Sequence, residues 1–145
     1  MKSLHIPIAL LHPDATVPGY AHHNDAGADL TCIDEVVIGP GERVLVSTGI
    51  ALAIPDGYVG LVHPRSGLAV KHGIGMVNAP GTIDAGYRGE IKVLLINLDP
   101  RETVTLPAGS RIAQLVIQEV VTATFTVLDS LDDTQRGAGG FGSTG

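Results

Sequence analysis

The sequence predicts one all-β domain of the sandwich, jelly-roll or barrel type. Short runs rich in β-branched residues alternate with turns, because 19 glycines and 9 prolines interrupt a chain of 145 residues. Pro-Gly pairs and a Pro-Asp-Gly triplet mark several turns, since proline presets φ and glycine accepts positive φ. No amphipathic helical pattern exceeds about two turns. Short strands at this spacing are typical of antiparallel β architectures.

The expected elements follow these runs in chain order. Residues 1–11 are mostly apolar, but a proline interrupts them and no small-residue cleavage site follows, so a first strand is favoured over a secretory signal. A short helix is expected over residues 66–71, just after a proline. Residues 82–88 predict two strands joined in a hairpin through an Ala-Gly pair. Further strands are expected at residues 33–38, 43–54, 58–63, 91–98, 103–106 and 111–121.

Composition and charge limit the possible functions. Hydrophobic residues make up 44% of the chain and tryptophan is absent, so the core is expected from Val, Ile, Leu and Ala. The single cysteine, Cys32, excludes an intrachain disulfide and fits a reducing cytosol. No run approaches the roughly 18 apolar residues of a membrane span. The net charge of -6 argues against binding to nucleic acid or anionic membranes, so we expect a cytoplasmic protein.

The few cations are unevenly spread along this acidic chain. They gather in and around distinctive segments, at Arg65, Lys71, Arg88, Lys92, Arg111 and Arg136. Such a set can hold a polyphosphate, although ordinary surface solubility explains it equally well. Residues 64–69 favour the phosphate interpretation, because Arg65 can bind phosphate oxygens in pairs and Ser66 can donate from its hydroxyl.

Two aspartates stand out as candidates for chemistry. Asp29 follows a flexible turn, where a capping role is the commoner explanation and an outer ligand of Mg²⁺ through water is the alternative. Asp84 lies in an otherwise neutral stretch and can orient and deprotonate a water. Tyr87 follows it and can stack on a ring. A structural hairpin with a solvated aspartate explains this segment equally well.

Two more segments are unusual. Strand alternation divides residues 111–115 between two faces, with Arg111, Ala113 and Leu115 on one and Ile112 and Gln114 on the other. Residues 136–145 contain five glycines and almost nothing to bury, so they are expected to be mobile on their own. They nevertheless carry a cation, two hydroxyls and a phenyl ring, which are groups that a ligand can engage.

Five segments have a distinctive order and spacing: Ala-Gly-Ala-Asp-Leu at 26–30, Pro-Arg-Ser-Gly-Leu-Ala at 64–69, Gly-Thr-Ile-Asp-Ala-Gly-Tyr-Arg-Gly at 81–89, Arg-Ile-Ala-Gln-Leu at 111–115, and the glycine-rich end. Together they resemble the motifs of the trimeric dUTPase family, particularly its actinobacterial members. The resemblance implies a distorted jelly-roll or β-clip subunit over residues 1–135 and a lid over residues 136–145. It also implies a homotrimer with active sites shared between chains.

The resemblance further implies Mg²⁺-dependent hydrolysis of dUTP to dUMP and pyrophosphate. That reaction limits uracil incorporation into DNA and supplies dUMP for dTMP synthesis. Asp84 would hold the water that attacks the α-phosphorus, and Tyr87 would pack on the deoxyribose and exclude a 2′-hydroxyl. The remaining roles implied by the family are uracil binding by Asn78, Gly81, Thr82 and Ile83 with Lys92 nearby, and phosphate binding by Arg65, Ser66 and Gly67.

Other residues would act through water or from the lid. Asp29 and Gln114 would touch the phosphates or their Mg²⁺ through water, and the lid would supply Phe141 to stack on uracil and Arg136, Ser143 and Thr144 to hold the γ-phosphate. Two rival functions stay open at this point. A dCTP deaminase shares the fold but needs an acid–base arrangement at the base. A non-catalytic nucleotide-binding trimer would tolerate the loss of Asp84 or the tail, both of which are present.

Overall fold

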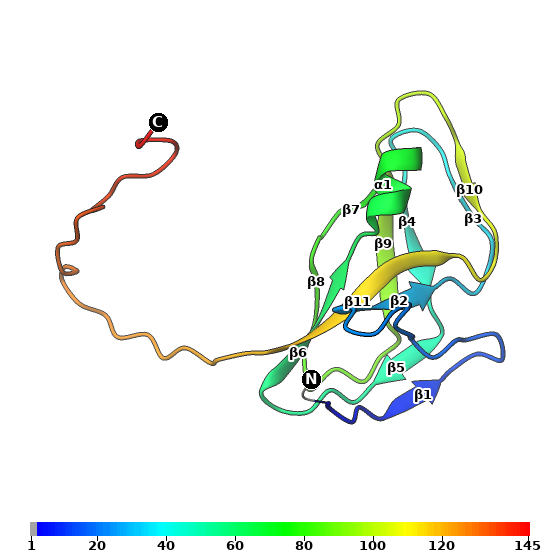
Figure 1. Cartoon of the computed structure of the whole chain (residues 1–145), viewed down its shortest axis with the longest axis horizontal. Helices are drawn as coiled ribbons and strands as arrows, with labels where there is room; N and C mark the ends of the chain where they lie inside the picture. The colour runs from blue at the N-terminus through cyan, green and yellow to red at the C-terminus, as the bar shows by residue number, and fades with distance from the viewer. Residues whose placement is uncertain (1–2) are drawn as a thin grey trace.

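The computed structural model describes residues 3–145, and most of its regular structure is β-strand (Figure 1). Short antiparallel strands form a jelly-roll-like body, with one helix, α1 (Ser66–His72), packed beside β7. The all-β prediction and the predicted short helix are therefore confirmed. The strands are β1 (Ile8–Leu10), β2 (Gly27–Thr31), β3 (Val36–Ile38), β4 (Arg43–Ser47), β5 (Ile50–Leu52), β6 (Tyr58–His63), β7 (Ile74–Met76), β8 (Gly81–Ile83), β9 (Lys92–Asn97), β10 (Val104–Leu106) and β11 (Arg111–Glu119).

Four antiparallel sheets make up the described body. The largest has the strand order β2-β11-β6-β8, and a second has the order β4-β9-β7. Two smaller sheets pair β1 with β5 and β10 with β3. Strands that pair come from distant parts of the sequence, as β2 and β11 do. The fold therefore brings motifs from both ends of the chain into one sheet.

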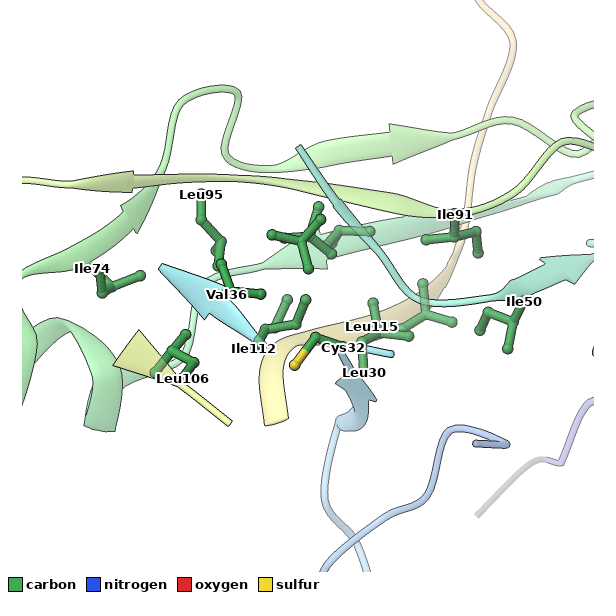
Figure 2. Packing of buried hydrophobic residues seen from close by; sticks show 14 of the residues in the cluster. Leu30, Cys32, Val36, Ile50, Ile74, Ile91, Leu95, Leu106, Ile112 and Leu115 are labelled. Carbon is green, nitrogen blue, oxygen red and sulfur yellow. The ribbon is translucent and has the colours of Figure 1, made fainter. Parts of the chain in front are cut away.

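The core is aliphatic, as the composition predicted. Side chains from different sheets point toward one another in its interior, including Leu30 on β2, Val36 on β3, Ile50 on β5 and Leu95 on β9 (Figure 2). Strand β9 shows how the sequence pattern produces this arrangement. Its Val93 and Leu95 are buried, because alternate residues of a strand face the same side.

Asn97 is a buried polar residue at the end of β9. Its amide nitrogen donates to the carbonyl oxygens of Ile38 (2.9 Å) and Glu102 (2.8 Å), and its amide oxygen accepts from the N–H of Asp99 (2.9 Å). Buried polar groups are tolerated when their hydrogen bonds are complete, and here all three bonds go to backbone. Asn97 therefore fastens β9 to β3 and to the turn that follows.

The hairpin predicted over residues 82–88 is wrong. Strand β8 pairs with β6, whereas β9 pairs with β4 and β7, so the two strands belong to different sheets. The turn at Ala85-Gly86 does form, and the N–H of Tyr87 bonds to the carbonyl of Asp84. The chain then continues to the other sheet, because Ile91 is buried in the core and its N–H bonds to Ile50 (2.8 Å). A local turn signal does not show which strand the next segment joins.

The predicted facing of residues 111–115 is also wrong at its start. A β-bulge lies between Arg111 and Ala113, so Arg111 pairs with Thr31, Ala113 with Leu30, and Gln114 with Asp29. Ile112 and Ala113 are both buried at this bulge. The bulge places Arg111 on the same face as Gln114 rather than with Ala113.

The chain beyond β11 runs away from the body as an extended tail (Figure 1). The last backbone hydrogen bond to the body is from the N–H of Val120 to the carbonyl of Gly57 (2.9 Å). After it, the hydrogen bonds of the described residues join only positions three apart, such as Gly139 to Arg136. Among residues 3–145, no helix is long and apolar enough to span a membrane.

Candidate active site

A charged cluster lies where β2 and β11 meet the end of β6. Asp29 on β2 pairs with Arg65 Nε at 3.2 Å and with Arg111 Nη1 at 3.2 Å. Arg65 also donates to the backbone carbonyl of Arg111 at 3.4 Å. Two guanidinium groups face one carboxylate, so the cluster keeps a net positive charge. Such an arrangement fixes both arginines and still attracts an anion, such as a phosphate chain.

The backbone places this cluster through the bulge in β11. The bulge turns Arg111 toward Asp29 and sets Gln114 directly opposite Asp29 in the sheet. The Gln114 amide nitrogen donates to the carbonyl of Pro64 at 3.1 Å. That bond fixes the strand end from which Arg65 extends. The segments 64–69 and 111–115 therefore meet because of the β-bulge, which cannot be recognised in either sequence.

Helix α1 begins directly after Arg65. Arg65 takes the N-cap position in extended geometry (φ -99°, ψ 127°) and makes no side-chain cap. Ser66 and Gly67 form the exposed first turn, and a β-carbon added at Gly67 would meet no atom within 4 Å. The space above this turn is open, which suits the predicted contact of Ser66 and Gly67 with phosphate.

A separate cavity of about 540 Å³ opens beside the segment between β8 and β9. Asp84 and Tyr87 both line it, and Tyr87 is 45% exposed. The full lining is Leu45, Thr82, Ile83, Asp84, Tyr87, Glu90, Ile91 and Lys92. Residues with a carboxylate, a phenol ring and an ammonium group thus line one cavity together with two residues of β8, which is a sound basis for binding a base and its sugar.

Asn78 lies just outside that cavity. It is exposed in the turn after β7, and a cis peptide bond joins Ala79 to Pro80 before β8 begins. A β-carbon added at Gly81 would lie 3.7 Å from the Asn78 amide nitrogen. Asn78 therefore lies beside Gly81, the first residue of β8. This position is compatible with the predicted binding of one base by Asn78 and β8.

The predicted site residues of the tail lie near neither the charged cluster at Asp29 nor the cavity at Asp84. Phe141 is fully exposed, and the side chain of Arg136 donates only to the carbonyl of Gly139 at 3.0 Å. Ser143 and Thr144 are exposed as well. In one chain the predicted site residues therefore fall into three groups: the charged cluster at Asp29, the cavity at Asp84, and the tail.

The structure gives two residues contacts that the sequence patterns do not indicate. Arg111 reaches Asp29 only because of the bulge, for which the sequence carries no signal. Glu90 lines the cavity and pairs with Lys92 at 3.7 Å. Opposite charges two positions apart at a strand start are the signal that could have indicated this pair.

The side chains present also indicate how the predicted Mg²⁺ could be bound. Within residues 3–145, no three His, Cys, Asp or Glu side chains gather as a metal site. The carboxylate of Asp29 is occupied by Arg65 and Arg111. This set fits a Mg²⁺ ion held mainly by phosphate oxygens and water, as that cation prefers, with Asp29 outside the inner ligands.

Comparison with known sequences settles the family. The family model described as dUTPase matches residues 13–145. The chain belongs to the dUTPase family. A deoxyuridine 5'-triphosphate nucleotidohydrolase of Thermobifida fusca is 60% identical over 143 residues, covering 99% of this chain and 80% of the relative. The enzyme of the same name from Cutibacterium acnes is 64% identical over 133 residues, covering 92% and 87%. These relatives agree with the actinobacterial resemblance of the motifs.

Solved structures of dUTPases share the fold. A mutant dUTPase of Staphylococcus bacteriophage 80alpha, solved with dUpNHpp, superposes with a TM-score of 0.91 at 29% identity and 99% coverage of both chains. A mutant dUTPase from phage phi11 of S. aureus, described as coordinating a structural Mg(II) ion, gives a TM-score of 0.82 at 28% identity, with 90% and 100% coverage. The likeness extends through the tail in the first structure.

Proposed function

We propose that this chain hydrolyses dUTP to dUMP and pyrophosphate, with Asp84 activating the water that attacks the α-phosphorus. The observation that carries the proposal is the cavity of about 540 Å³ that both Asp84 and Tyr87 line. Family membership supports the same reaction, because relatives more than half identical over nearly the whole chain are named for it.

Asp84 suits the role of general base by its position. It follows β8 directly, at the start of a turn that its own carbonyl closes by accepting from Tyr87 N–H (3.1 Å). No salt bridge in the described structure occupies its carboxylate, whereas Asp29 is held by two arginines. A free carboxylate within reach of a water can orient it and take its proton.

The base and sugar would lie against β8 and the turn after it. Thr82 and Ile83 line the cavity, and Asn78 lies beside Gly81. A pocket that hydrogen-bonds one base through fixed backbone groups rejects another by roughly 10⁴ or more in favourable cases, because wrong partners leave those groups unpaired. Lys92 is held at the rim by Glu90, and Tyr87 would pack on the deoxyribose.

The charged cluster would hold the triphosphate. Arg65 supplies a guanidinium already oriented by Asp29, and Ser66 and Gly67 leave open space for phosphate oxygens. Gln114 would contact the chain or its metal through water. Bound Mg²⁺ would neutralise phosphate charge and present the α-phosphorus in line with the water. Positioning and charge neutralisation are what this class of reaction requires.

A complete site would need more than one copy of the chain. The charged cluster does not line the cavity, and the tail lies away from both groups. Leu45 on β4 and Leu98, the residue after β9, are exposed apolar side chains that suit contact with another copy. A homotrimer would join one chain's cluster to another chain's cavity, with residues 136–145 closing over the site and Arg136, Phe141, Ser143 and Thr144 engaging the nucleotide.

The substrate test is pyrophosphate release from dUTP, dTTP, dCTP and UTP at equal concentrations. The proposal predicts rapid release from dUTP alone, and comparable rates with all four would contradict it. Ammonia release from dCTP would favour a deaminase, and binding without turnover would favour a regulatory protein. The lone buried cysteine, Cys32, agrees with an enzyme of the reducing cytoplasm.

A further inference from the structure

We infer that Gly89 and Glu90 are positioning residues for Tyr87, and that the discrimination between deoxyribose and ribose depends on them. The inference rests on the proposed function, in which the Tyr87 ring packs on the sugar. Neither residue needs to touch the nucleotide. Their task is to hold the ring where a 2′-hydroxyl would have to go.

The Tyr87 ring folds back over Gly89. A β-carbon added at Gly89 would lie 2.5 Å from the phenol oxygen, 2.6 Å from Cζ and 3.0 Å from Cε2. Those separations are shorter than real side chains tolerate, so any other residue at position 89 displaces the ring. Gly89 is not among the residues with positive φ, so alanine fits the backbone and fails only on space.

Glu90 binds the hydroxyl at this same end of the ring. Its backbone carbonyl accepts the Tyr87 hydroxyl at 2.9 Å. Its side-chain Oε1 accepts the N–H of Gly49 at 3.0 Å, and its Oε2 lies 3.7 Å from Lys92 Nζ. The Glu90 side chain is 24% exposed, so water competes little for these bonds. The carboxylate thus links the acceptor of the Tyr87 hydroxyl to a distant turn.

That turn is itself fixed in the fold. Gly49 adopts φ 71° between β4 and β5, a conformation that glycine accepts readily. Next to it, the hydroxyl of Thr48 donates to the carbonyl of Ile91, and the N–H of Ile91 bonds to Ile50 at 2.8 Å. Three bonds from residues 48–50 therefore hold the segment Glu90–Ile91, to which the Tyr87 hydroxyl is attached.

The Tyr87 ring can exclude a ribose only if the ring is held in place when a 2′-hydroxyl presses against it. The half-exposed Tyr87 ring has solvent on one side, so its resistance comes from the hydroxyl bond to Glu90 and the surface of Gly89 beneath it. Loosening either support lets the ring yield to a ribose 2′-hydroxyl. The expected consequence is a loss of selectivity larger than the loss of activity on dUTP.

The test compares kcat/KM for dUTP and UTP in the wild type, Gly89→Ala, Glu90→Ala and Glu90→Gln. We expect the dUTP/UTP ratio to fall roughly tenfold or more in both alanine variants, which corresponds to about 1.4 kcal/mol. Glu90→Gln keeps an acceptor for Gly49 and should restore much of the ratio. The matched control is Glu42→Ala, because Glu42 accepts a glycine N–H in the same way (Gly39, 2.8 Å) and is not part of the site.

A double-mutant cycle separates positioning from general damage. In a Tyr87→Ala background the ring is absent, so Gly89→Ala should change the ratio no further. The thermal midpoint of Gly89→Ala should stay near the wild-type value, since only the end of one side chain must move. An unchanged ratio in both alanine variants, or an equal effect with and without Tyr87, would overturn the inference.

A spectroscopic measurement tests the position of the Tyr87 ring even if the chain does not hydrolyse dUTP. The chain has three tyrosines, so fluorotyrosine labelling gives a ¹⁹F spectrum in which Tyr87→Phe assigns one signal. That signal should shift in Gly89→Ala and Glu90→Ala and stay in place in Glu42→Ala. If wild type fails to hydrolyse dUTP, the function is wrong while the ring shift still decides the positioning role; an unmoved signal overturns that role.

Discussion

Two glycine-rich segments of this chain behave in opposite ways. The segment 84–91, between β8 and β9, is tied to residues 48–50 by bonds through Glu90 and Ile91, and Tyr87 is bonded within it. The tail 136–145 makes only bonds between positions three apart and extends from the body (Figure 1). Both contain a ring, a cation and small residues.

The difference shows that glycine content alone does not determine order. The first segment lies between two strands and ends on a buried residue, Ile91, so its backbone groups find partners in the body. The tail follows the last strand and buries nothing. On the proposed function, the segment 84–91 would be preorganised, whereas the tail would become ordered only on a ligand or a partner copy.

The largest effect is expected in residues 84–91, the anchored segment. Asp84→Asn should keep nucleotide binding and lose turnover by roughly 10²–10⁴, because the amide cannot take a proton from water. Binding is measured by calorimetry with dUpNHpp, and turnover by pyrophosphate release. Asp56→Asn, an exposed turn aspartate, is the control and should leave both unchanged. Near-normal turnover in Asp84→Asn would remove Asp84 from the mechanism.

Removing residues 136–145 should give the next largest effect and no loss of fold. The expected fall in kcat/KM is roughly 10²-fold, from the loss of one charged contact and one stacking contact. The thermal midpoint should not change, since the tail makes no hydrogen bond to the body of its own chain. Full activity in the truncated chain would mean that the tail is no lid.

Asn97→Leu tests the body to which the anchored segment belongs. It leaves the carbonyls of Ile38 and Glu102 and the N–H of Asp99 without their buried partner. We expect a loss of about 2–3 kcal/mol in the free energy of unfolding, measured by urea denaturation. A stability equal to wild type would show that these groups find other partners.

The smallest effect is expected at an exposed turn. The pKa of Asp99 is lowered by hydrogen bonds from the backbone N–H groups of Glu102 and Arg101. Because the folded pKa lies below the unfolded one, the stabilisation is present above the usual carboxyl range and disappears as pH falls through the folded pKa. Thermal midpoints of wild type and Asp99→Asn should therefore differ at pH 7, and the difference should shrink as the pH is lowered below the usual carboxyl range. A difference independent of pH would contradict this.

The sequence predicted elements better than their pairing. The β-branched runs located most strands, and the helix was expected at 66–71 and found at Ser66–His72, because turn and strand preferences are local. The hairpin at 82–88 failed because burial of Ile91, a long-range effect, directs the chain to another sheet.

In the candidate site, too, local features were predictable from the sequence and long-range contacts were not. Asp84 and Tyr87 line the same cavity, since they are three residues apart around one turn. The contact of Arg111 with Asp29 could not be predicted from the sequence, because it depends on a bulge whose register is set by the paired strand. The support of Tyr87 by Gly89 is likewise visible only once the ring has been placed.

The central claim is that the anchored segment of one chain works with the tail of another. The direct test mixes two inactive chains, full-length Asp84→Asn and a chain with Asp84 that ends at residue 135, refolded together and purified through two different tags. If each site draws its carboxylate and its tail from different copies, dUTP hydrolysis should return to about one third of the wild-type rate per site, because purification through both tags keeps only mixed trimers and each of these has one site with both an intact Asp84 and a tail. Mixed oligomers without activity would contradict a shared site.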